Sequence, residues 1–342
     1  MYKIAFYNIH RELNRNNFMF DNANATIGDD LLKPFMEMKE YASEKGIQLF
    51  TMEAHRNNEA NAYVFIDMPR KNNKFFQEAI QSQQKLYLIM FESELIKKEN
   101  YLAENHAHFE KIFTHNDKLV DNKKFIKINF SHTFPKTINM NISNKEKLCT
   151  LIAGNKKSTH PLELYSKRVE AIRWFEENHP QDFDLYGVGW EEYTFHGPRP
   201  IRLLNKFRFM KKLLAEKFPS YKGKIDRKRD VLAKYKFAIC YENARDIDGY
   251  ITEKIFDCFF AGCVPIYWGA NNITDHIPSN CFIDRRDFKT YEDLYHFMKN
   301  MSDVDFLGYL KRIKDFLSSS DSYQFTCDYF AKTIIEGIIC ET

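Results

Sequence analysis

Short apolar runs alternate with longer polar stretches along the first third of the chain. The runs have the length of buried strands, and the stretches between them carry the apolar spacing of helices. The predicted strands are Lys3–Asn8, Ile47–Met52, Ala62–Met68, Lys85–Phe91 and Phe125–Phe130, and the predicted helices are Leu31–Glu44 and Lys74–Gln83. Strands that alternate with helices indicate a parallel sheet covered by helices on its faces.

The same alternation returns after a polar stretch at Ser131–Lys147, which contains Pro135 and is predicted to be a linker. The predicted strands of this second half are Leu148–Ala153, Phe183–Tyr186, Phe237–Tyr241, Val264–Tyr267 and Cys281–Ile283. The predicted helices are Pro161–Glu177, Ile201–Leu214 and Glu253–Ala261, followed by a helical tail. The chain is therefore expected to be an α/β protein with two Rossmann-like domains facing each other across a cleft, and ligands should lie at the strand-to-helix junctions.

The charge balance and the apolar content exclude several classes of protein. The 342 residues carry 50 Lys and Arg against 47 Asp and Glu, which does not predict a nucleic-acid-binding protein. The first residues are too quickly polar for a signal peptide, and the most apolar stretch, Ile255–Ala270, is shorter than the ~20 residues of a membrane span. Seven cysteines without a CxxC pair fit a reducing compartment. A cytoplasmic protein is expected.

The densest chemical signal runs from Tyr235 to Gly269. It reads as a buried strand, a polar loop, a helix that begins near Thr252, and another buried strand. Thr252 is the expected N-cap, and Glu253 suits the helix dipole, but a cation at Lys254 costs about a few tenths of a kcal/mol unless an anion binds there. The pattern suggests a phosphate held by helix N–H groups and Lys254, with Glu253 free to accept two ribose hydroxyls. The alternative is an ordinary surface helix with an unremarkable Glu–Lys pair.

The residues of this segment resemble a known family. Tyr241-Glu-Asn243, then Tyr250-Ile-Thr-Glu-Lys-Ile255, then Ala261-Gly-Cys-Val-Pro-Ile-Tyr-Trp-Gly269 closely resemble glycosyltransferase family ten, the α-1,3/1,4-fucosyltransferases. A looser similarity covers residues 148–290. The resemblance implies a GT-B fold, with an acceptor-binding domain at 1–135, a GDP-sugar-binding domain at 148–310 and a helical tail at 311–342.

The resemblance also implies roles for particular residues at the donor. Asn243, Tyr250, Glu253 and Lys254 would contact GDP-fucose, with Glu253 on the ribose and Lys254 on the diphosphate. The chain departs from many members of the family at Gly249, where they carry Asp.

Two further donor contacts are implied outside this segment. The stretches Leu148–Asn155 and Glu163–Arg173 are similar to the strand, the Asn-containing loop and the Arg-bearing helix of the family. Arg168 falls where the family binds the donor phosphates, which a planar guanidinium can clamp through two hydrogen bonds. Asn155 would contact the donor too. The alternative for Arg168 is a solvated helical side chain.

Two carboxylates follow the apolar strand at Lys85–Met90, in Phe91-Glu-Ser-Glu94. A carboxylate at the carboxyl end of a central strand faces the cleft in such folds. The family has a Glu in a similar context, proposed as the catalytic base, and Glu92 matches it best. Glu94 has the same side-chain parity in an extended chain and stays an alternative base. Otherwise, both are surface carboxylates.

No obligatory metal is expected, and GDP-fucose would be a co-substrate. The His residues lack ligand spacing, and Asp182-x-Asp184 reads as part of a strand and turn, although it looks like the metal motif of other glycosyltransferases. Family ten generally works without that motif. The stretch Lys211–Asp230 holds eight Lys or Arg and three acids, which is usual for a solvated face and leaves a peripheral contact with an anionic membrane open.

The resemblance implies an inverting transfer of L-fucose from GDP-β-L-fucose to a hydroxyl of a glycan, with an α-1,3/1,4 linkage. The acceptor would be an oligosaccharide or a lipopolysaccharide-type glycan, reached in the cytoplasm or at the inner face of the membrane. The first alternative is another nucleotide-activated sugar, a deoxyhexose or a heptose, on the same scaffold. The second is a non-catalytic glycan- or nucleotide-binding module.

Overall fold

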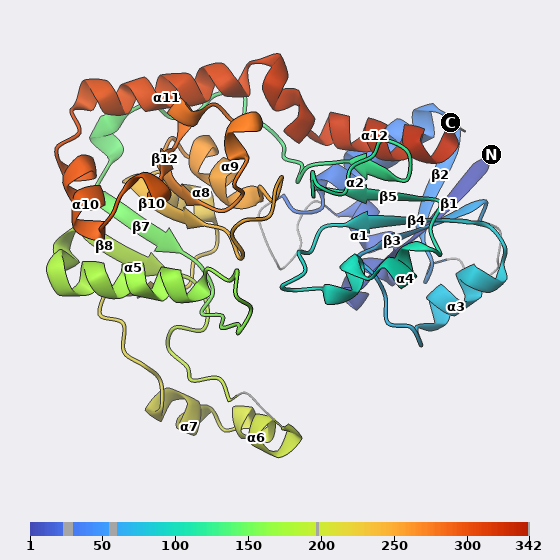
Figure 1. Cartoon of the computed structure of the whole chain (residues 1–342), viewed down its shortest axis with the longest axis horizontal. Coiled ribbons are helices and arrows are strands. Elements are labelled where there is room, and N and C mark those ends of the chain that lie inside the picture. The colour runs from blue at the N-terminus through green and yellow to red at the C-terminus, as the bar shows by residue number, and fades with distance from the viewer. Residues whose placement is uncertain (23–29, 55–59, 196–197, 341–342) are drawn as a thin grey trace.

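Two six-stranded sheets, each parallel throughout, form the frame of the molecule in the computed structural model, which describes residues 1–22, 30–54, 60–195 and 198–340 (Figure 1). The first sheet has the strand order β2-β1-β3-β4-β5-β6. Its strands are β1 (Tyr2–Asn8), β2 (Ile47–Thr51), β3 (Ala62–Ile66), β4 (Lys85–Met90), β5 (Lys111–Thr114) and β6 (Phe125–Lys127). The second sheet has the order β12-β11-β10-β7-β8-β9. Its strands are β7 (Lys147–Ile152), β8 (Phe183–Tyr186), β9 (Tyr221–Gly223), β10 (Tyr235–Tyr241), β11 (Val264–Trp268) and β12 (Ile283–Asp284).

Helices cover both faces of the first sheet. The helices α1 (Phe18–Asp21) and α2 (Lys33–Glu44) pack on one face, and α3 (Lys74–Gln81) packs on the other, while α4 (Ala103–His106) is a short turn after β4. Alternate residues of each strand therefore enter two different cores, as Phe6 and Tyr7 of β1 do. Burial on both faces explains why the strands read as continuous apolar runs in the sequence.

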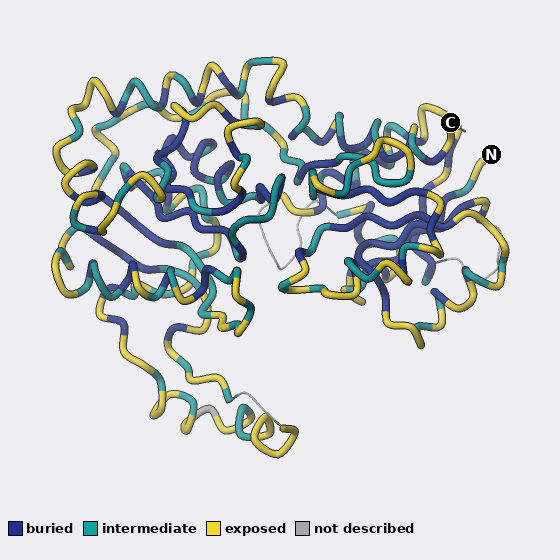
Figure 2. The backbone as a smooth tube through the Cα atoms, in the orientation of Figure 1, coloured by how far each residue is buried: buried dark blue, intermediate teal, exposed yellow. Residues whose placement is uncertain are grey.

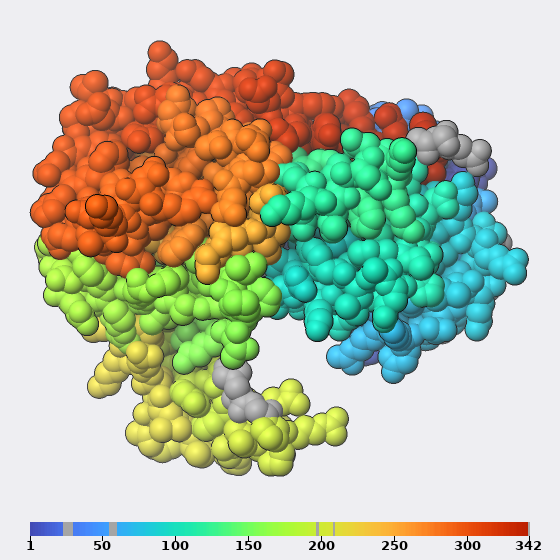
Figure 3. Space-filling model, in the orientation of Figure 1, coloured from blue at the N-terminus to red at the C-terminus, as the bar shows by residue number. Residues whose placement is uncertain are grey.

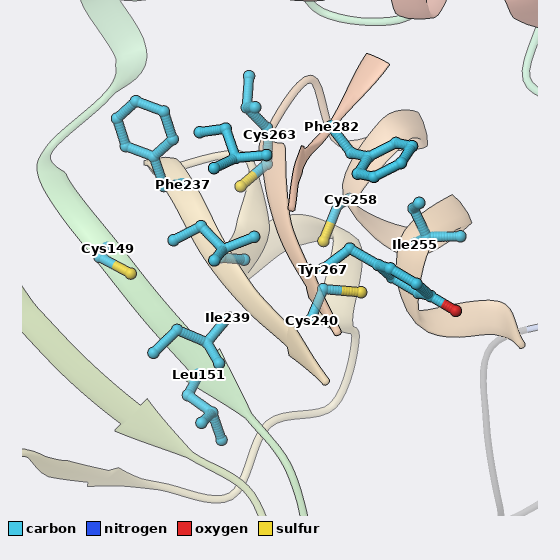
Figure 4. Packing of buried hydrophobic residues seen from close by; sticks show 14 of the residues in the cluster. Cys149, Leu151, Phe237, Ile239, Cys240, Ile255, Cys258, Cys263, Tyr267 and Phe282 are labelled. Atoms are coloured by element: carbon cyan, nitrogen blue, oxygen red, sulfur yellow. The ribbon is translucent and has the colours of Figure 1, made fainter. Parts of the chain in front are cut away.

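The second domain is built around one larger core. Its helices are α5 (Tyr165–Asn178), α6 (Arg199–Leu203), α7 (Arg208–Leu213), α8 (Lys228–Leu232), α9 (Glu253–Phe260), α10 (Tyr291–Lys299) and α11 (Asp303–Leu317). In Figure 4 the side chains of β7, β10 and α9 interlock in this core, and the free cysteines Cys149, Cys240, Cys258 and Cys263 are part of it. These thiols serve as small apolar groups.

The end of the chain does not belong to the second domain. The helix α12 (Cys327–Ile339) crosses to the first domain and packs against α2, next to the N-terminus (Figure 1). Tyr87 of β4 donates a hydrogen bond to the carbonyl of Ile338 (3.2 Å), and the Lys111 ammonium donates to that of Gly337 (3.0 Å). The boundary predicted at residue 310 also lies inside α11. The predicted tail is therefore divided between the domains: the end of α11 packs in the second core, and α12 packs in the first core.

The other differences from the predicted elements concern short or exposed segments. The strands β5 and β9 have four and three residues, too few to show a period of two in the sequence. The strand predicted at Phe125–Phe130 ends at Lys127, and the single helix predicted at Ile201–Leu214 is broken into α6, a 3-10 turn and α7. That segment buries no apolar face that would keep it in one straight helix.

A polar cluster joins the two domains beside the interdomain cleft. The carboxylate of Asp117, in the loop between β5 and β6, accepts hydrogen bonds from Asn272 (2.8 Å) and His276 (2.7 Å) of the second domain. It also pairs with Lys127 (2.5 Å). Burial opposes ionisation of this carboxyl, but its three partners outweigh burial and hold the pKa of Asp117 below its ordinary value. The cluster is one of the contacts that join the two domains.

None of the helices within the described ranges is long and apolar enough to cross a membrane.

Candidate active site

The predicted site residues lie at the carboxyl edges of the two sheets, which face each other. Glu92 follows β4 of the first sheet, while Asn243 and Asn155 follow β10 and β7 of the second. The helix α9 begins at the same edge, since the loop after β10 leads into it. Charges on Lys156 and Lys254 of the second domain act on Glu92 of the first. The topology thus brings groups from both domains to one cleft.

Glu92 is held by a buried carboxylate beneath it. The backbone amides of Phe91 and Glu92 both donate to Oδ1 of Asp67 (3.0 Å each), which follows β3. Asn100 donates to the same oxygen (2.7 Å) and to the carbonyl of Glu92 (3.1 Å). Asp67 adopts a φ of 55°, a left-handed conformation that Asp tolerates better than most residues. This turn directs its carboxylate under the strand end.

The surroundings of Glu92 favour its protonated form near neutrality. Burial, and then repulsion by Asp67, raise the pKa of Glu92 to about 7, while Lys156 and Lys254 act in the opposite direction. A general base works best when its pKa lies near the operating pH. Glu92 therefore has the pKa that a general base needs, and repulsion by Asp67 contributes to it.

Glu94 is placed differently from Glu92. The chain leaves the extended conformation after Met90, so the parity that would put both carboxylates on one side does not hold. Glu94 is exposed, whereas Glu92 is half-buried and faces the second domain. The geometry favours Glu92 over Glu94 as the base.

The start of α9 is organised by Glu242, a residue to which the sequence pattern assigned no role. Its fully buried carboxylate accepts the backbone amide of Thr252 (2.8 Å) and the hydroxyl of Thr252 (2.6 Å). Thr252 occupies the N-cap position as predicted, but its side chain does not cap the helix, because the hydroxyl is used by Glu242. The first amides of α9 therefore have no side-chain cap from Thr252.

Lys254 lies against the same carboxylate. Its ammonium is 3.2 Å from Oε2 of Glu242 and donates to the hydroxyl of Thr252 (2.8 Å). Burial alone would lower the pKa of Lys254, but Glu242 and Glu253 outweigh it and keep the ammonium charged. A cation that is misplaced for the helix dipole is thus stabilised by a buried acid, and it still has a partly exposed side.

Glu253 points toward solvent beside two cations. Its side chain is 45% exposed, and Oε1 lies 3.5 Å from Lys228 and 3.4 Å from Lys254. Partial burial opposes ionisation, but these two ammonium groups hold the pKa of Glu253 below its ordinary value. Glu253 is thus an ionised and accessible acceptor at the start of α9, as a ribose contact requires.

Arg168 is not the solvated helical residue that the sequence left as an alternative. It is 5% exposed, and one of its guanidinium nitrogens donates to the carbonyl of Tyr241 (2.7 Å) and to Oδ1 of Asn243 (3.1 Å). The guanidinium lies 5.1 Å from the ring of Tyr165. Arg168 therefore braces the end of β10 and orients Asn243.

Tyr250 is buried between the domains. Its ring lies 5.0 Å from that of His115 and 6.0 Å from that of Phe130, and Asn243 donates toward its hydroxyl (3.5 Å). The preceding residue must be glycine here, because Gly249 has a φ of 76° and a Cβ would fall 2.2 Å from the carbonyl of His115. The loop thus packs directly on the first domain, and Tyr250 belongs to the domain interface.

The loop after β7 lies beside these groups. The amide of Asn155 donates to the carbonyl of Val188 (2.9 Å) and its side chain donates to that of Gly189 (3.1 Å), which ties the loop to the chain after β8. The side chain of Lys156 is exposed, and its charge acts on Glu92. Lys156 is a cleft residue that was not predicted from the sequence. It could have been considered, because it directly follows Asn155, a predicted donor contact.

The residues of the Asp182-x-Asp184 pattern are used within the second domain. Asp182 pairs with Lys299 (2.8 Å), and Asp184 pairs with Lys147 (2.9 Å) and accepts from Tyr235 (2.6 Å). Within the described residues, no group of three His, Cys, Asp or Glu side chains is arranged to hold a metal ion.

A cavity of about 640 Å³ opens at the carboxyl edge of the first sheet. It is lined by Arg11 after β1, Glu53 after β2 and Arg70 after β3, and also by Arg15 and Lys74. Among the described residues, none of these four cations has a carboxylate within ion-pair distance. Because Glu92 follows β4 at the same edge, the cavity and the carboxylate share one side of the sheet. Its lining suits a ligand that carries negative charge.

Comparison with known proteins identifies a family. The model of "Glycosyltransferase family 10 (fucosyltransferase) C-term" matches residues 142–332, more than half of the chain. An alpha-(1,3)-fucosyltransferase of Helicobacter pylori is 35% identical over 75 residues, which are 22% of this chain and 16% of that protein. An alpha-(1,4)-fucosyltransferase of Arabidopsis thaliana is 36% identical over 72 residues, 21% of this chain and 18% of that one. The matched segments span less than a fifth of these relatives.

Solved structures share the fold over the whole chain. A crystal structure of an alpha1,3-fucosyltransferase with GDP-fucose aligns with a TM-score of 0.58 and 15% identity, covering 100% of this chain and 91% of that one. A DNA-modifying beta-glucosyltransferase aligns with a TM-score of 0.53 and 14% identity, covering 97% and 99%. The predicted fold class is confirmed: the chain has the GT-B arrangement of two Rossmann-like domains.

Proposed function

The chain belongs to glycosyltransferase family 10, and on that premise we propose that it transfers L-fucose from GDP-β-L-fucose to a hydroxyl of a glycan, with inversion at the anomeric carbon. The observation that carries the proposal is that an acid of the first domain and a cation of the second domain act on each other electrostatically across the cleft. Glu92 has a pKa near 7, and the charge of the Lys254 ammonium at the start of α9 acts on it. One can remove a proton, and the other can receive the charge of a leaving diphosphate.

The transfer takes place in a single displacement. Glu92 accepts the proton of the acceptor hydroxyl while the acceptor oxygen forms a bond to C1 of fucose. The bond from C1 to the β-phosphate oxygen breaks, and its electron pair leaves with GDP. Attack from the side opposite the leaving group converts the β-linked donor into an α-linked product, and an α-1,3 or α-1,4 linkage is the family's expectation.

The donor lies against the second domain. Lys254 and amides at the start of α9, which Thr252 does not cap, hold the diphosphate, and Glu253 accepts two ribose hydroxyls. Arg168 keeps Asn243 in position through one guanidinium nitrogen. The remaining N–H groups of the Arg168 guanidinium are directed to the phosphates. Asn155 and Tyr250 shape the loops on either side. Charges fixed before the reaction are typically the largest contribution to catalysis.

We expect the donor to bind and react without a divalent metal, because cations of the chain can balance the diphosphate. In the presence of EDTA, GDP-fucose should raise the melting temperature. At a donor concentration of a hundred times its Kd, binding adds about 2.7 kcal/mol to the free energy of unfolding. Differential scanning fluorimetry and a transfer assay, each with and without EDTA, measure this. Turnover that EDTA abolishes and a metal restores would contradict the metal-free reaction. A larger rise in melting temperature with another GDP-deoxyhexose or with a nucleotide-activated heptose would show that this sugar, and not fucose, is the donor.

The acceptor is expected in the cavity at the carboxyl edge of the first sheet, and its basic lining favours a glycan that carries phosphate or carboxylate groups. Arg70→Ala should raise KM for such an acceptor by about one to two decades, the share of a lost charge-assisted hydrogen bond. The Kd of GDP-fucose should stay unchanged. Lys71→Ala is the matched control, because Lys71 pairs with Glu104 on the surface (2.8 Å). Equal KM values in both variants would remove the acceptor from this cavity.

A further inference from the structure

A helical arm projects from the second domain between β8 and β9. It comprises residues 198–214, with α6, a 3-10 turn and α7, and it extends away from the body in Figures 1 and 3. Figure 2 shows that the arm is mostly exposed, and none of its side chains whose burial is described is buried. Helices of five and six residues are too short to be stable in water on their own. The arm therefore has the character of a segment that packs against a partner.

Large apolar side chains are concentrated on this arm. Seven of them are exposed: Ile201 (44%), Leu203 (54%), Phe207 (58%), Phe209 (78%), Met210 (37%), Leu213 (71%) and Leu214 (51%). Elsewhere the exposed apolar residues are scattered along the described chain, which is normal for a protein surface. A cluster of this kind marks an interaction site.

The charges of the arm have a single sign. Residues 199–214 contain six Lys or Arg and no Asp or Glu, whereas the whole chain has nearly equal numbers of each. Arg199, Arg202, Lys206 and Lys212 have no carboxylate within ion-pair distance among the described residues. Exposed apolar groups between unpaired cations are the composition of segments that lie in the interface of an anionic membrane.

The arm is braced against the loop that precedes it. At its base, the Asn205 side chain donates to the carbonyl of Phe195 and accepts from its amide (2.9 Å each), and the amide of Tyr193 donates to the carbonyl of Lys211 (2.8 Å). The arm leaves the body after Val188, whose carbonyl accepts the amide of Asn155 (2.9 Å). The chain thus enters the arm from the carboxyl edge of the second sheet, the edge at which the candidate site lies.

We propose that the arm binds the surface of an anionic lipid bilayer. Phe207, Phe209 and Leu213 enter the boundary between headgroups and acyl chains, and the Lys and Arg side chains contact lipid phosphates. A second copy of the chain is a poorer occupant, because two arms would bring six like charges against six. The proposal is independent of the donor sugar and extends the proposed function to acceptors presented at a membrane.

Cosedimentation with vesicles tests the proposal. The full chain should bind vesicles of phosphatidylcholine with phosphatidylglycerol, bind pure phosphatidylcholine vesicles much more weakly, and lose affinity as salt is raised. A Phe207→Ser/Phe209→Ser/Leu213→Ser variant and a Lys206→Glu/Lys212→Glu variant should each partition at least about tenfold more weakly, since one Lys or Arg near such a surface contributes about fivefold.

Matched controls separate this surface from the active site. Phe297→Ser/Val304→Ser removes exposed apolar groups from α10 and α11 and should bind vesicles like the wild type. All variants should keep the wild-type melting temperature and the wild-type response to GDP-fucose. If the proposed function is wrong, the response to GDP-fucose is absent from every protein, while the difference in vesicle binding between the variants remains. Arm variants that bind vesicles as the wild type does would overturn the proposal. The proposal would also be overturned if the wild type formed a dimer without lipid and the arm variants were monomers, because the arm would then bind a second copy of the chain.

Discussion

Replacing Glu92 by Gln is expected to lower the rate of fucosyl transfer by ~10²–10⁴-fold, the usual share of a general base, and to leave the Kd of GDP-fucose close to that of the wild type. The substitution keeps the shape of the side chain and removes the oxygen that would accept the acceptor's proton. The backbone of Glu92 stays anchored, because its amide binds Asp67 (3.0 Å) whatever the side chain is. A donor titration and an initial-rate assay on the same protein measure the two effects.

The pH profile gives a second signature of the same residue. Glu92 must be ionised to accept a proton, and its pKa is raised to about 7 by burial and then by Asp67. The wild-type kcat/KM should therefore rise as the pH increases through about 7 and level off above it. In Glu92→Gln this limb should vanish, and only the slow residual reaction should remain.

Glu94→Gln is the matched control, two residues away and exposed. It should transfer fucose at nearly the wild-type rate and keep the pH limb. A silent Glu92→Gln beside a crippled Glu94→Gln would move the base by two residues. Full activity in both variants would remove the carboxylate-base mechanism from this strand end.

Lys254→Ala is expected to weaken donor binding and to slow transfer, each by about one to two decades. A lost charge-assisted contact with the diphosphate costs roughly 1.5–3 kcal/mol. The truncation also leaves the buried Glu242 without its cation (3.2 Å in the wild type), which should lower the free energy of unfolding. Urea unfolding, followed by isothermal titration with GDP-fucose where the variant is folded, separates the two effects.

Lys236→Ala serves as the control for that variant. Lys236 lies near the amino end of β10, away from the cleft, and pairs with Asp303 (2.9 Å), so its loss removes a paired Lys of the second domain without touching the cleft. Donor affinity and transfer rate should match the wild type. If Lys254→Ala binds GDP-fucose as tightly as this control, Lys254 is only the structural partner of Glu242.

The alternation of apolar and polar segments was enough to predict two parallel sheets. Strands buried on both faces read as continuous apolar runs, and β1 and β10 were recognised for that reason. The motif residues after β4 and β10 were expected at the cleft, because the carboxyl ends of parallel strands share one edge. The family match over residues 142–332 agrees with the segment on which the sequence resemblance rested.

Groups whose roles depend on distant contacts could not be read from the chain. Asp67 carries the same signal as Glu92, a carboxylate directly after a buried strand, yet only the pairing of β3 with β4 places it beneath Glu92. Glu242 stood inside the quoted motif, but its task of holding Thr252 and Lys254 requires the fold of the loop between them. A solvated side chain was the alternative that the helical neighbours of Arg168 left open, and only the contact with the end of β10 shows that it is buried.

Local sequence thus determined the elements, their order and which strand ends carry polar side chains, because periodicity and turn chemistry act over a few residues. Tertiary structure alone decided which domain each late segment joins and which charges meet. The sequence of α12 is that of an ordinary apolar helix, and only its packing against α2 assigns it to the first core. The hydrogen bond from Tyr41 to Glu336 illustrates this, because it joins residues that are 295 positions apart in the sequence. The pKa of Glu92 arises in the same way, from burial and from charges on both domains that no stretch of sequence contains together.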